Sequence, residues 1–254
     1  MTTHQTGRLV ILSGPSCVGK SPLYKSLGKF YPELHAQFHK LVLVNSRAPR
    51  PGEVQAVDYD FRTRTQVEAL RADLRYAVLE ARNDLQAVDV PELQSWLRRG
   101  DVFFEGNPFV GRALRAHPSL AGVNRLSIFL SPLSNEEIVY LRAPERKVSL
   151  HDFLTDVMRR KLLRRTRSQK GDLSSKDLED IETRASSAYR ELQGAWQFQY
   201  VIPNHDGEDS DNWEAFYYPI GDARKTLDAF AGLLKGFVPP SVENWEEDLL
   251  PPES

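Results

Sequence analysis

Short apolar runs alternate along this chain with segments in which apolar residues recur at helical spacing. Strands are predicted at residues 8–13, 41–44, 101–105, 125–131 and 199–203. Helices are predicted at residues 20–29, 91–100, 150–162, 178–192 and 222–234. Such alternation is typical of an α/β fold in which a mostly parallel sheet is covered by helices.

Three polar segments interrupt this pattern. Residues 166–176 join two predicted helices, and their polar composition predicts a mobile connection. Residues 205–213, HDGEDSDNW, are strongly acidic but lack the glycine and glutamate spacing of an EF-hand, so we expect a solvated loop. Residues 238–254 are rich in proline and acid and are expected to form an extended tail.

The first predicted turn carries the most specific motif. GPSCVGKS, at 14–21, fits the G-x-x-x-x-G-K-[ST] pattern and lies between a predicted strand and a predicted helix, as a phosphate-binding loop requires. Its backbone N–H groups can surround a triphosphate, its lysine can reach the terminal phosphates, and its last hydroxyl can ligate Mg²⁺. The predicted ATP-binding residues are Gly14, Pro15, Ser16, Cys17, Val18, Gly19, Lys20 and Ser21, with Ser21 also the predicted magnesium ligand.

Composition narrows the class of protein. A formal net charge of −2 and an isoelectric point near 6.3 give no overall attraction to nucleic acid or anionic membranes. Cys17 is the single cysteine, which excludes an intrachain disulfide and a cysteine-rich metal site. The N-terminus has no apolar stretch long enough for a signal peptide or a membrane span. We therefore expect a cytoplasmic protein that binds small molecules, and the sequence leaves a homodimer open.

A second stretch, NSRAPRPGEVQAVDYDF at 45–61, is suited to a dianionic phosphate. Arg47 and Arg50 supply bidentate donors in a proline-rich loop, and Tyr59 supplies a hydroxyl. Here the sequence resembles the guanylate kinase family, whose acceptor segment reads T-T-R-x-P-R-x-G-E and then reaches a tyrosine. The matching positions are Arg47, Arg50, Gly52, Glu53 and Tyr59.

The resemblance covers about residues 8–235 and implies a P-loop kinase three-layer fold. It implies one domain over 1–237, with an acceptor lobe near 36–100 and a helical lid near 145–190, followed by the acidic tail at 238–254. Lid arginines neutralise charge on the transferring phosphoryl group in such enzymes, while lid closure excludes water. By this resemblance the catalytic residues are Lys20, Arg164, Arg165 and Arg184, and Asn204 lies near the adenine of ATP.

The part that identifies the acceptor departs from the family. Leu43 stands where the family has a base-reading serine, no Tyr-Gly-Thr occurs, and a family D-x-D strand end is replaced by Glu105-Gly106-Asn107. Glu80 or Asp84 could still accept the two N–H donors of a guanine edge. Glu105 could orient Mg²⁺ through water or face the acceptor, and a plain surface carboxylate is equally compatible with its position.

Three functions follow. The leading one is an ATP- and Mg²⁺-dependent kinase acting on a nucleoside monophosphate, with GMP the first candidate. The second is a kinase for another phosphorylated small molecule such as a ribose phosphate, for which Arg71, Arg75 and Arg82 are the extra cationic candidates. The third is a non-catalytic, nucleotide-gated binding module, which would bind ATP without turnover.

Overall fold

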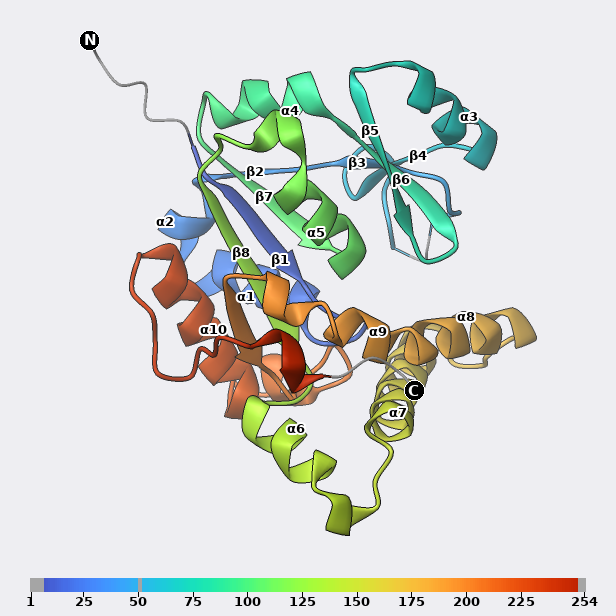
Figure 1. The fold of residues 1–254 in the computed structure, drawn as a ribbon, viewed down its shortest axis with the longest axis vertical. Helices are drawn as coiled ribbons and strands as arrows, with labels where there is room; N and C mark the ends of the chain where they lie inside the picture. The colour runs from blue at the N-terminus through green and yellow to red at the C-terminus, as the bar shows by residue number, and fades with distance from the viewer. Residues whose placement is uncertain (1–6, 50–51, 251–254) are drawn as a thin grey trace. The chain divides into compact units, whose positions relative to one another are not determined.

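The computed structural model describes residues 7–49 and 52–250. Its α/β fold has two sheets (Figure 1). A five-stranded sheet has the order β2-β7-β1-β8-β9, and a four-stranded sheet has the order β4-β3-β6-β5. In the first sheet β2 pairs with β7, and β8 with β9, in the parallel sense. The strands β7, β8 and β9 coincide with predicted apolar runs, whereas β2 was not predicted. None of the described helices is long and apolar enough to cross a membrane.

The chain divides into two compact units. The first comprises Met1–Leu12 and Gln37–Ser127, and the second comprises Ser13–Ala36 and Ile128–Ser254. The predicted acceptor lobe thus falls in the first unit, and the phosphate loop and the lid region fall in the second.

The first unit contains most of the strands. They are β1 (Leu9–Ser13, whose last residue belongs to the second unit), β2 (Phe38–Lys40), β3 (Leu43–Asn45), β4 (Tyr59–Phe61), β5 (Tyr76–Ala81), β6 (Asp84–Asp89) and β7 (Asp101–Gly106). Its helices are α3 (Arg64–Ala69), α4 (Val90–Leu97) and α5 (Pro108–Ala116), with short 3-10 turns at Leu70–Ala72 and Pro118–Leu120.

The β5–β6 hairpin and helix α3 form a small core of their own (Figure 1). Val67 on α3 packs with Val44, Leu85 and Ala87 of the four-stranded sheet. The Thr63 side chain accepts a hydrogen bond from the Gln66 N–H, and the Gln66 side chain accepts one from the Thr63 N–H. This capping box fixes where α3 begins. Strand β3, which contributes Val44 to this core, ends at Asn45, two residues before the predicted phosphate-binding Arg47.

The second unit is mainly helical. Its helices are α1 (Lys20–Phe30), α2 (Pro32–His35), α6 (Asn135–Arg142), α7 (Leu150–Lys170), α8 (Ser175–Ser186), α9 (Ala188–Leu192) and α10 (Gly221–Leu234). Its strands are β8 (Arg125–Ser131, from Ile128 onward) and β9 (Tyr200–Pro203). Further 3-10 turns lie at Pro144–Arg146, Ala195–Gln197, Asp211–Trp213 and Glu247–Leu249.

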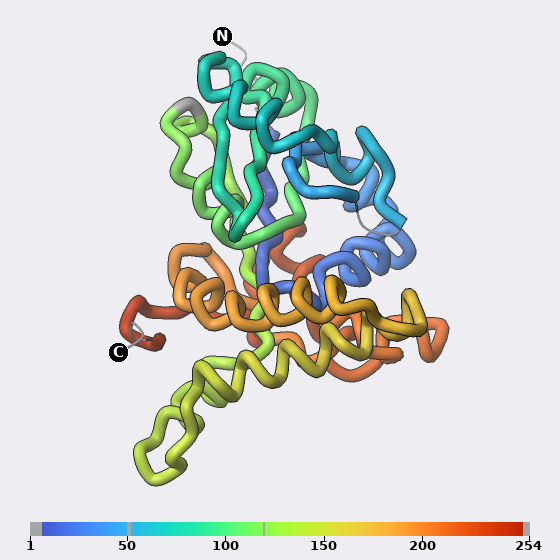
Figure 2. The backbone as a smooth tube through the Cα atoms, turned by 90° about the vertical axis from the view of Figure 1, so that its right-hand side faces the viewer, coloured from blue at the N-terminus to red at the C-terminus, as the bar shows by residue number. Residues whose placement is uncertain are grey.

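Helices α7 and α8 run side by side, and the connection between them is shorter than expected (Figure 2). The prediction of a mobile segment over 166–176 is wrong, because α7 continues to Lys170 and α8 begins at Ser175. Arg159 on α7 pairs with Asp156 on the same helix and with Glu182 on α8, so these ion pairs also join the two helices. Gly171 ends the helix in the left-handed region, with φ 76°.

The described part of the C-terminal segment packs against the second unit. Trp245, Leu249 and Leu250 are buried, and the backbone of Glu243 pairs with that of Val201 in β9. Arg142 of α6 donates to the carbonyl groups of Asp248 and Leu249. The expectation of an extended tail is therefore wrong up to Leu250.

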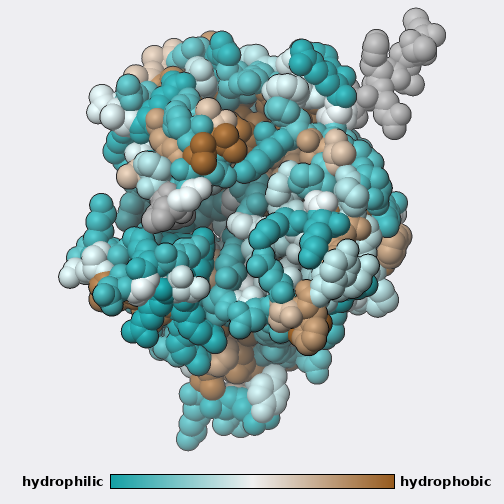
Figure 3. Space-filling view, turned by 180° about the vertical axis from the view of Figure 1, so that it is seen from behind, coloured by the Kyte–Doolittle hydropathy of each residue, from teal (hydrophilic) through white to brown (hydrophobic). Residues whose placement is uncertain are grey.

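Apolar side chains lie inside both units. The largest fully buried side chains include Phe103 and Phe104 in the first unit and Phe129 and Phe230 in the second. On the face drawn in Figure 3 hydrophilic residues predominate and hydrophobic ones form small, scattered patches.

Candidate active site

The phosphate loop follows β1 and leads directly into α1. A Cβ on Gly14 would lie 2.5 Å from the carbonyl oxygen of Leu130, so only glycine allows the loop to pass β8 here. Gly19 precedes the helix in the left-handed region, with φ 104°, and no side chain caps α1. Because Gly19 has no side chain to cap the helix, the N–H groups in the first turn of α1 can bind an anion.

Lys20 is folded back along the loop. Its Nζ donates to the carbonyl oxygens of Gly14 at 2.9 Å and Pro15 at 2.7 Å, and the residue is 8% exposed. Its positive charge thus lies beneath the loop, close to the amides that would surround a phosphate.

The lid region brings a buried arginine to the same loop. Nε of Arg184, on α8, lies 3.2 Å from Oγ of Ser16, and Nη1 lies 3.0 Å from the Asp180 carboxylate. Within the second unit, a predicted catalytic arginine and the predicted phosphate loop are therefore in contact. Asn204, fully buried, also reaches the loop, because its Nδ2 donates to the carbonyl oxygen of Val18 at 2.7 Å.

The acidic segment 205–213 also lies on the phosphate loop, so the prediction of a solvated loop is wrong. Oε2 of Glu208 accepts a hydrogen bond from the backbone N–H of Gly19 at 3.0 Å. The Asp209 side chain, 4% exposed, pairs with Lys161 at 3.6 Å and with Arg164 at 3.2 Å. Acidic composition predicts exposure, but here the carboxylates meet positive partners from elements distant in sequence.

Charge and burial act on the Glu208 carboxyl in opposite directions. Burial alone would raise its pKa, but the positive charges of Lys20 and Arg165 and the Gly19 hydrogen bond outweigh that effect and hold the pKa below its usual value. Glu208 is therefore an anion at neutral pH. Burial has the opposite outcome at Cys17, where it raises the pKa of the thiol, as do the nearby charges of Glu208 and Asp209. Cys17 is accordingly a neutral loop residue and no nucleophile.

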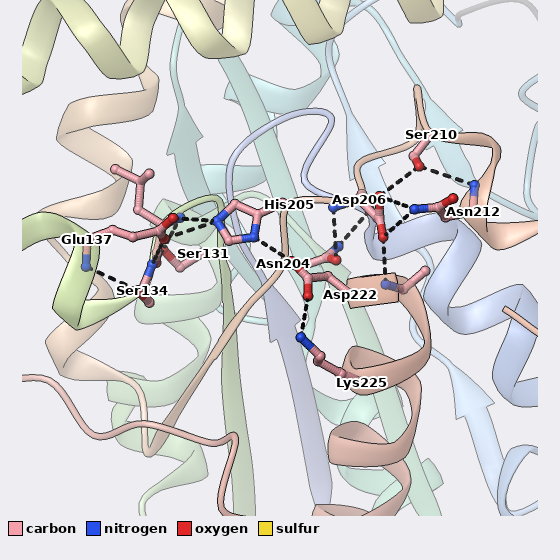
Figure 4. Close-up of polar contacts among 12 residues, drawn as sticks. Ser131, Ser134, Glu137, Asn204, His205, Asp206, Ser210, Asn212, Asp222 and Lys225 are labelled. Atoms are coloured by element: carbon pink, nitrogen blue, oxygen red, sulfur yellow. Dashed lines mark hydrogen bonds and ion pairs between the residues drawn. The ribbon is translucent and has the colours of Figure 1, made fainter. Parts of the chain in front are cut away.

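A hydrogen-bond network holds the base of the acidic segment (Figure 4). The Asp206 carboxylate accepts from Ser210 Oγ at 2.8 Å, from Asn212 Nδ2 at 2.9 Å and from the Ala223 N–H at 2.9 Å. Trp213 Nε1 donates to the carbonyl oxygens of Asp206 at 2.8 Å and Gly207 at 3.1 Å. Beside this network, His205 lies between the carboxylates of Glu137 and Asp222.

The predicted acceptor residues lie in the first unit. Both terminal nitrogens of Arg47 donate to the Glu53 carboxylate at 2.6 Å, and the guanidinium lies 5.1 Å from the centre of the Tyr59 ring. Glu53 raises the pKa of Arg47 although burial opposes this, so the side chain is a permanent cation. Arg50 lies outside the described residues.

Arg47 also lines a pocket of about 380 Å³, together with Ser46, Ala48, Pro49, Phe61, Arg62, Thr63 and Gln66. Asp84, at the start of β6, is near enough to Arg47 for its charge to raise the arginine's pKa. Glu80 instead points outward, since its side chain is 79% exposed and pairs with Arg71 at 3.7 Å. Glu105 is half-buried on β7.

Two of the three arginines suggested for a phosphorylated sugar are engaged with acids. Arg71 pairs with Glu68 at 2.8 Å as well as with Glu80, and Arg75 pairs with Asp89. A second acceptor phosphate would therefore compete with these carboxylates for Arg71 and Arg75.

Among the residues that the structure describes, no group of three or more His, Cys, Asp or Glu side chains is arranged to hold a metal ion. Mg²⁺ in kinases is held by one or two protein oxygens together with phosphates and waters, so a dedicated cage is not required. The Ser21 hydroxyl in the first turn of α1, next to Lys20, is an oxygen of the kind that Mg²⁺ prefers, and the site fits the ion.

Lys161, Glu208 and Asp209 belong to the site but were missed in the sequence. Lys161 was only one member of a basic helix, and its contact with the carbonyl oxygen of His205 spans 44 residues. Glu208 and Asp209 belong to an acidic cluster that composition marks as unusual without indicating its partners.

The chain is similar to several guanylate kinases. It is 34% identical over 208 residues to the guanylate kinase of Bacillus subtilis (strain 168), covering 80% of this chain and 84% of that protein. It is 30% identical over 230 residues to that of Synechococcus sp. (strain JA-3-3Ab), covering 84% and 83% of the two chains. No family model matches the chain.

A solved structure supports the fold. The crystal structure of guanylate kinase from Anaplasma phagocytophilum aligns with a TM-score of 0.52 at 18% identity, covering 91% of this chain and 86% of that one. At that identity the likeness shows the α/β fold, in agreement with the fold class predicted from the alternation of strands and helices.

Proposed function

Since this chain belongs to the guanylate kinase family of nucleoside monophosphate kinases, we propose that it transfers the terminal phosphoryl group of ATP to a nucleoside monophosphate, with GMP the first candidate acceptor. The observation that carries the proposal is the contact between the Arg184 guanidinium and Ser16 of the phosphate loop, at 3.2 Å. It joins a predicted lid cation to the predicted donor-phosphate site within one compact unit.

Donor binding is assigned to the loop from Gly14 to Ser21. The backbone N–H groups at the start of α1 bind phosphate oxygens, and Lys20 exchanges its contacts with Gly14 and Pro15 for the phosphates. Asn204 supports the loop through the Val18 carbonyl, in addition to its predicted position near the adenine.

Charge neutralisation is assigned to the lid. Arg184, Arg165 and Arg164 lie on α8 and α7, and the first two act on groups of the loop region in this structure. A phosphoryl group in transfer carries charge on its peripheral oxygens, and fixed cations lower the energy of that state more than that of the bound substrate. Mg²⁺, when bound at Ser21 and the phosphates, would add charge neutralisation of the same kind.

Acceptor binding is assigned to Arg47, Arg50 and Tyr59. The Arg47 guanidinium lies against the Tyr59 ring, and both of its terminal nitrogens donate to Glu53, so a phosphate that takes this fork replaces the Glu53 carboxylate. No protein base is required, since an acceptor phosphate is already ionised near neutral pH. Asp84, whose charge reaches Arg47, is a better candidate than the outward-pointing Glu80 for reading the base.

The test is a turnover screen of the full chain with Mg²⁺ and ATP against GMP, dGMP, the other nucleoside monophosphates and ribose phosphates. ADP release together with a product heavier by one phosphoryl group would establish the activity and identify the acceptor. Conversion of a ribose phosphate but no nucleotide would favour the alternative acceptor class. ATP binding without any product would contradict the kinase and favour a nucleotide-gated regulator.

A further inference from the structure

The amide that precedes α1 already has an anionic partner within the chain. The N–H of Gly19 belongs to the part of the loop that surrounds donor phosphates, and it donates at 3.0 Å to Oε2 of Glu208. Lys20 and Arg165, two of the proposed phosphate-neutralising cations, both stabilise the ionised form of Glu208. A carboxylate thus has the partners expected for a nucleotide phosphate.

Asp209, the residue after Glu208, pairs in a similar way with cations of the predicted lid. Asp209 is nearly inaccessible, with 4% of its side chain exposed, and pairs with Lys161 at 3.6 Å and Arg164 at 3.2 Å on α7. Two successive carboxylates therefore connect the phosphate loop to the basic lid helix. Each carboxylate pairs with positive groups that the phosphates of ATP would otherwise bind.

We propose that residues 206–209, here named the acidic loop, are a built-in competitor of the donor triphosphate. Glu208 and Asp209, the tip of this loop, hold the phosphate loop and the lid helix in a state that excludes ATP, and ATP binds when the tip withdraws. The inference rests on the proposed function, because it concerns the same donor site.

The acidic loop is built to approach the phosphate loop closely. A Cβ on Gly207 would lie only 2.1 Å from the Cys17 carbonyl oxygen, so the position requires glycine. On either side of the tip the contacts are neutral or local: Trp213 holds the carbonyl oxygens of Asp206 and Gly207, and Asn204 Nδ2 holds that of Asp206 at 2.7 Å. The base is thus fixed to its own unit, while the tip is held by charges that ATP can replace.

A consequence follows for affinity. When only a fraction of the molecules has its phosphate loop uncovered, the apparent dissociation constant for ATP rises by the inverse of that fraction. Removing the competing charge of Glu208 should therefore tighten ATP binding. If Glu208 instead helped to hold a catalytic Mg²⁺, removing its charge would weaken ATP binding.

The experiment is calorimetric titration of ATP, with Mg²⁺ and without acceptor, into the wild-type chain, Glu208→Gln, Glu208→Ala and the control Glu214→Gln. Glu214 is an exposed acid that pairs with Lys25 on α1 and does not contact the phosphate loop in the described contacts. We expect about tenfold tighter binding for both Glu208 variants, the size expected for loss of one charge-assisted hydrogen bond, and wild-type affinity for the control. Unchanged or weaker binding in the Glu208 variants would overturn the inference.

Hydrogen exchange on the wild-type chain gives a second measurement that does not depend on a variant folding. Saturating ATP should increase amide exchange at the tip of the acidic loop, because the loop leaves the phosphate loop; unchanged or slower exchange there would overturn the inference. Failure of the proposed function has a different signature, namely ADP production by none of the four proteins with any acceptor, whatever their ATP affinities.

Discussion

Nε of Arg184 lies 3.2 Å from the hydroxyl of Ser16, although 168 residues separate them in the sequence. Arg184 is also among the least exposed charged residues, with 8% of its side chain accessible, and Asp180 lies one helical turn before it. The pair links the lid region to the phosphate loop without a mobile surface side chain, so the position of this cation is fixed before any substrate binds.

We expect Arg184→Ala to lower kcat about a hundredfold or more while changing the KM for ATP much less, because a cation aimed at the transferring group acts mainly in the transition state. Steady-state kinetics with saturating acceptor measures this split. Arg159→Ala is the matched control, since Arg159 lies on the adjacent helix and pairs with Glu182 at the surface. Equal losses in both variants would indicate a structural effect on the lid helices.

Lys20→Ala should lower turnover about a thousandfold, because Lys20 is the loop residue that we propose reaches the terminal phosphates. Its present partners, the carbonyl groups of Gly14 and Pro15, are part of the loop itself. Lys25→Ala, on the exposed side of the same helix, should retain activity. Turnover by Lys20→Ala within tenfold of wild type would contradict the assigned role.

Arg47→Ala should raise the KM for the acceptor between about tenfold and a hundredfold, the loss expected for one charged hydrogen-bonding group. Arg47 lies in the first unit and the donor-loop residues lie in the second, so ATP affinity should not change. Separate titrations with ATP and with the acceptor would test this division. An equal loss of ATP binding in Arg47→Ala and Lys20→Ala would contradict it.

The phosphate loop and most strands of the five-stranded sheet could be predicted from short stretches of sequence. The phosphate loop requires glycine at Gly14 for close packing and at Gly19 for its backbone conformation, so its pattern is visible in eight consecutive residues. The strands of the five-stranded sheet were visible as apolar runs, except β2, whose residues Phe38–Lys40 include two polar side chains.

The β5–β6 hairpin was not predicted, because neither its turn nor its strands carry the usual sequence signals. Its turn, Arg82–Asn83, has no glycine, and Arg82 itself adopts the left-handed conformation with φ 59°. Charged residues also interrupt the apolar positions of both strands, with Glu80 in β5 and Asp84 in β6 beside the turn.

The contact between Gly19 and Glu208 could not be predicted from sequence. The two residues are 189 positions apart, and an acidic cluster by composition alone favours solvent. Only tertiary packing supplies the opposite charges of Lys161 and Arg164 that bury Asp209. The assigned roles of the site residues stay predictions until the variants above are measured.

Trp245→Ala should destabilise the chain by about 3 kcal/mol, as expected for removing a buried tryptophan side chain. Trp245 is 6% exposed, and its Nε1 donates to the Glu243 carboxylate at 2.7 Å. Phe237→Ala is the control, since Phe237 is an aromatic residue of the same region that is 56% exposed. Chemical denaturation measures both, and equal small losses would mean that the C-terminal segment adds little to the second unit.

His205 should make stability depend on pH. Its ring nitrogens face Glu137, from α6, and Asp222, from α10, and Lys225 also pairs with Asp222. Burial alone would lower the pKa of His205, but its hydrogen bond with Asp222 and the charge of Glu137 outweigh that effect, so its folded pKa lies above the ordinary value of 6.5. Burial alone would raise the pKa of Asp222, but its hydrogen bonds with His205 and Lys225 outweigh that effect and lower the pKa from 3.8.

The sign of the effect follows from linkage. A histidine whose pKa is raised by folding stabilises the folded state fully below its unfolded pKa, and this stabilisation is lost as pH rises through the folded value. A carboxyl whose pKa is lowered stabilises above its unfolded pKa and loses that contribution as pH falls through the folded value. The free energy of unfolding of wild type minus that of His205→Gln should therefore be largest between the unfolded values of 3.8 and 6.5 and decline above 6.5. Because the His205 side chain is 48% exposed, solvent screening keeps the difference small.

Urea denaturation at pH 5.5, 7 and 8.5 tests this pH dependence, with His117→Gln as a control for a general effect of removing a histidine. A difference that grows toward pH 8.5 would be the wrong sign and would contradict the ion-pair account.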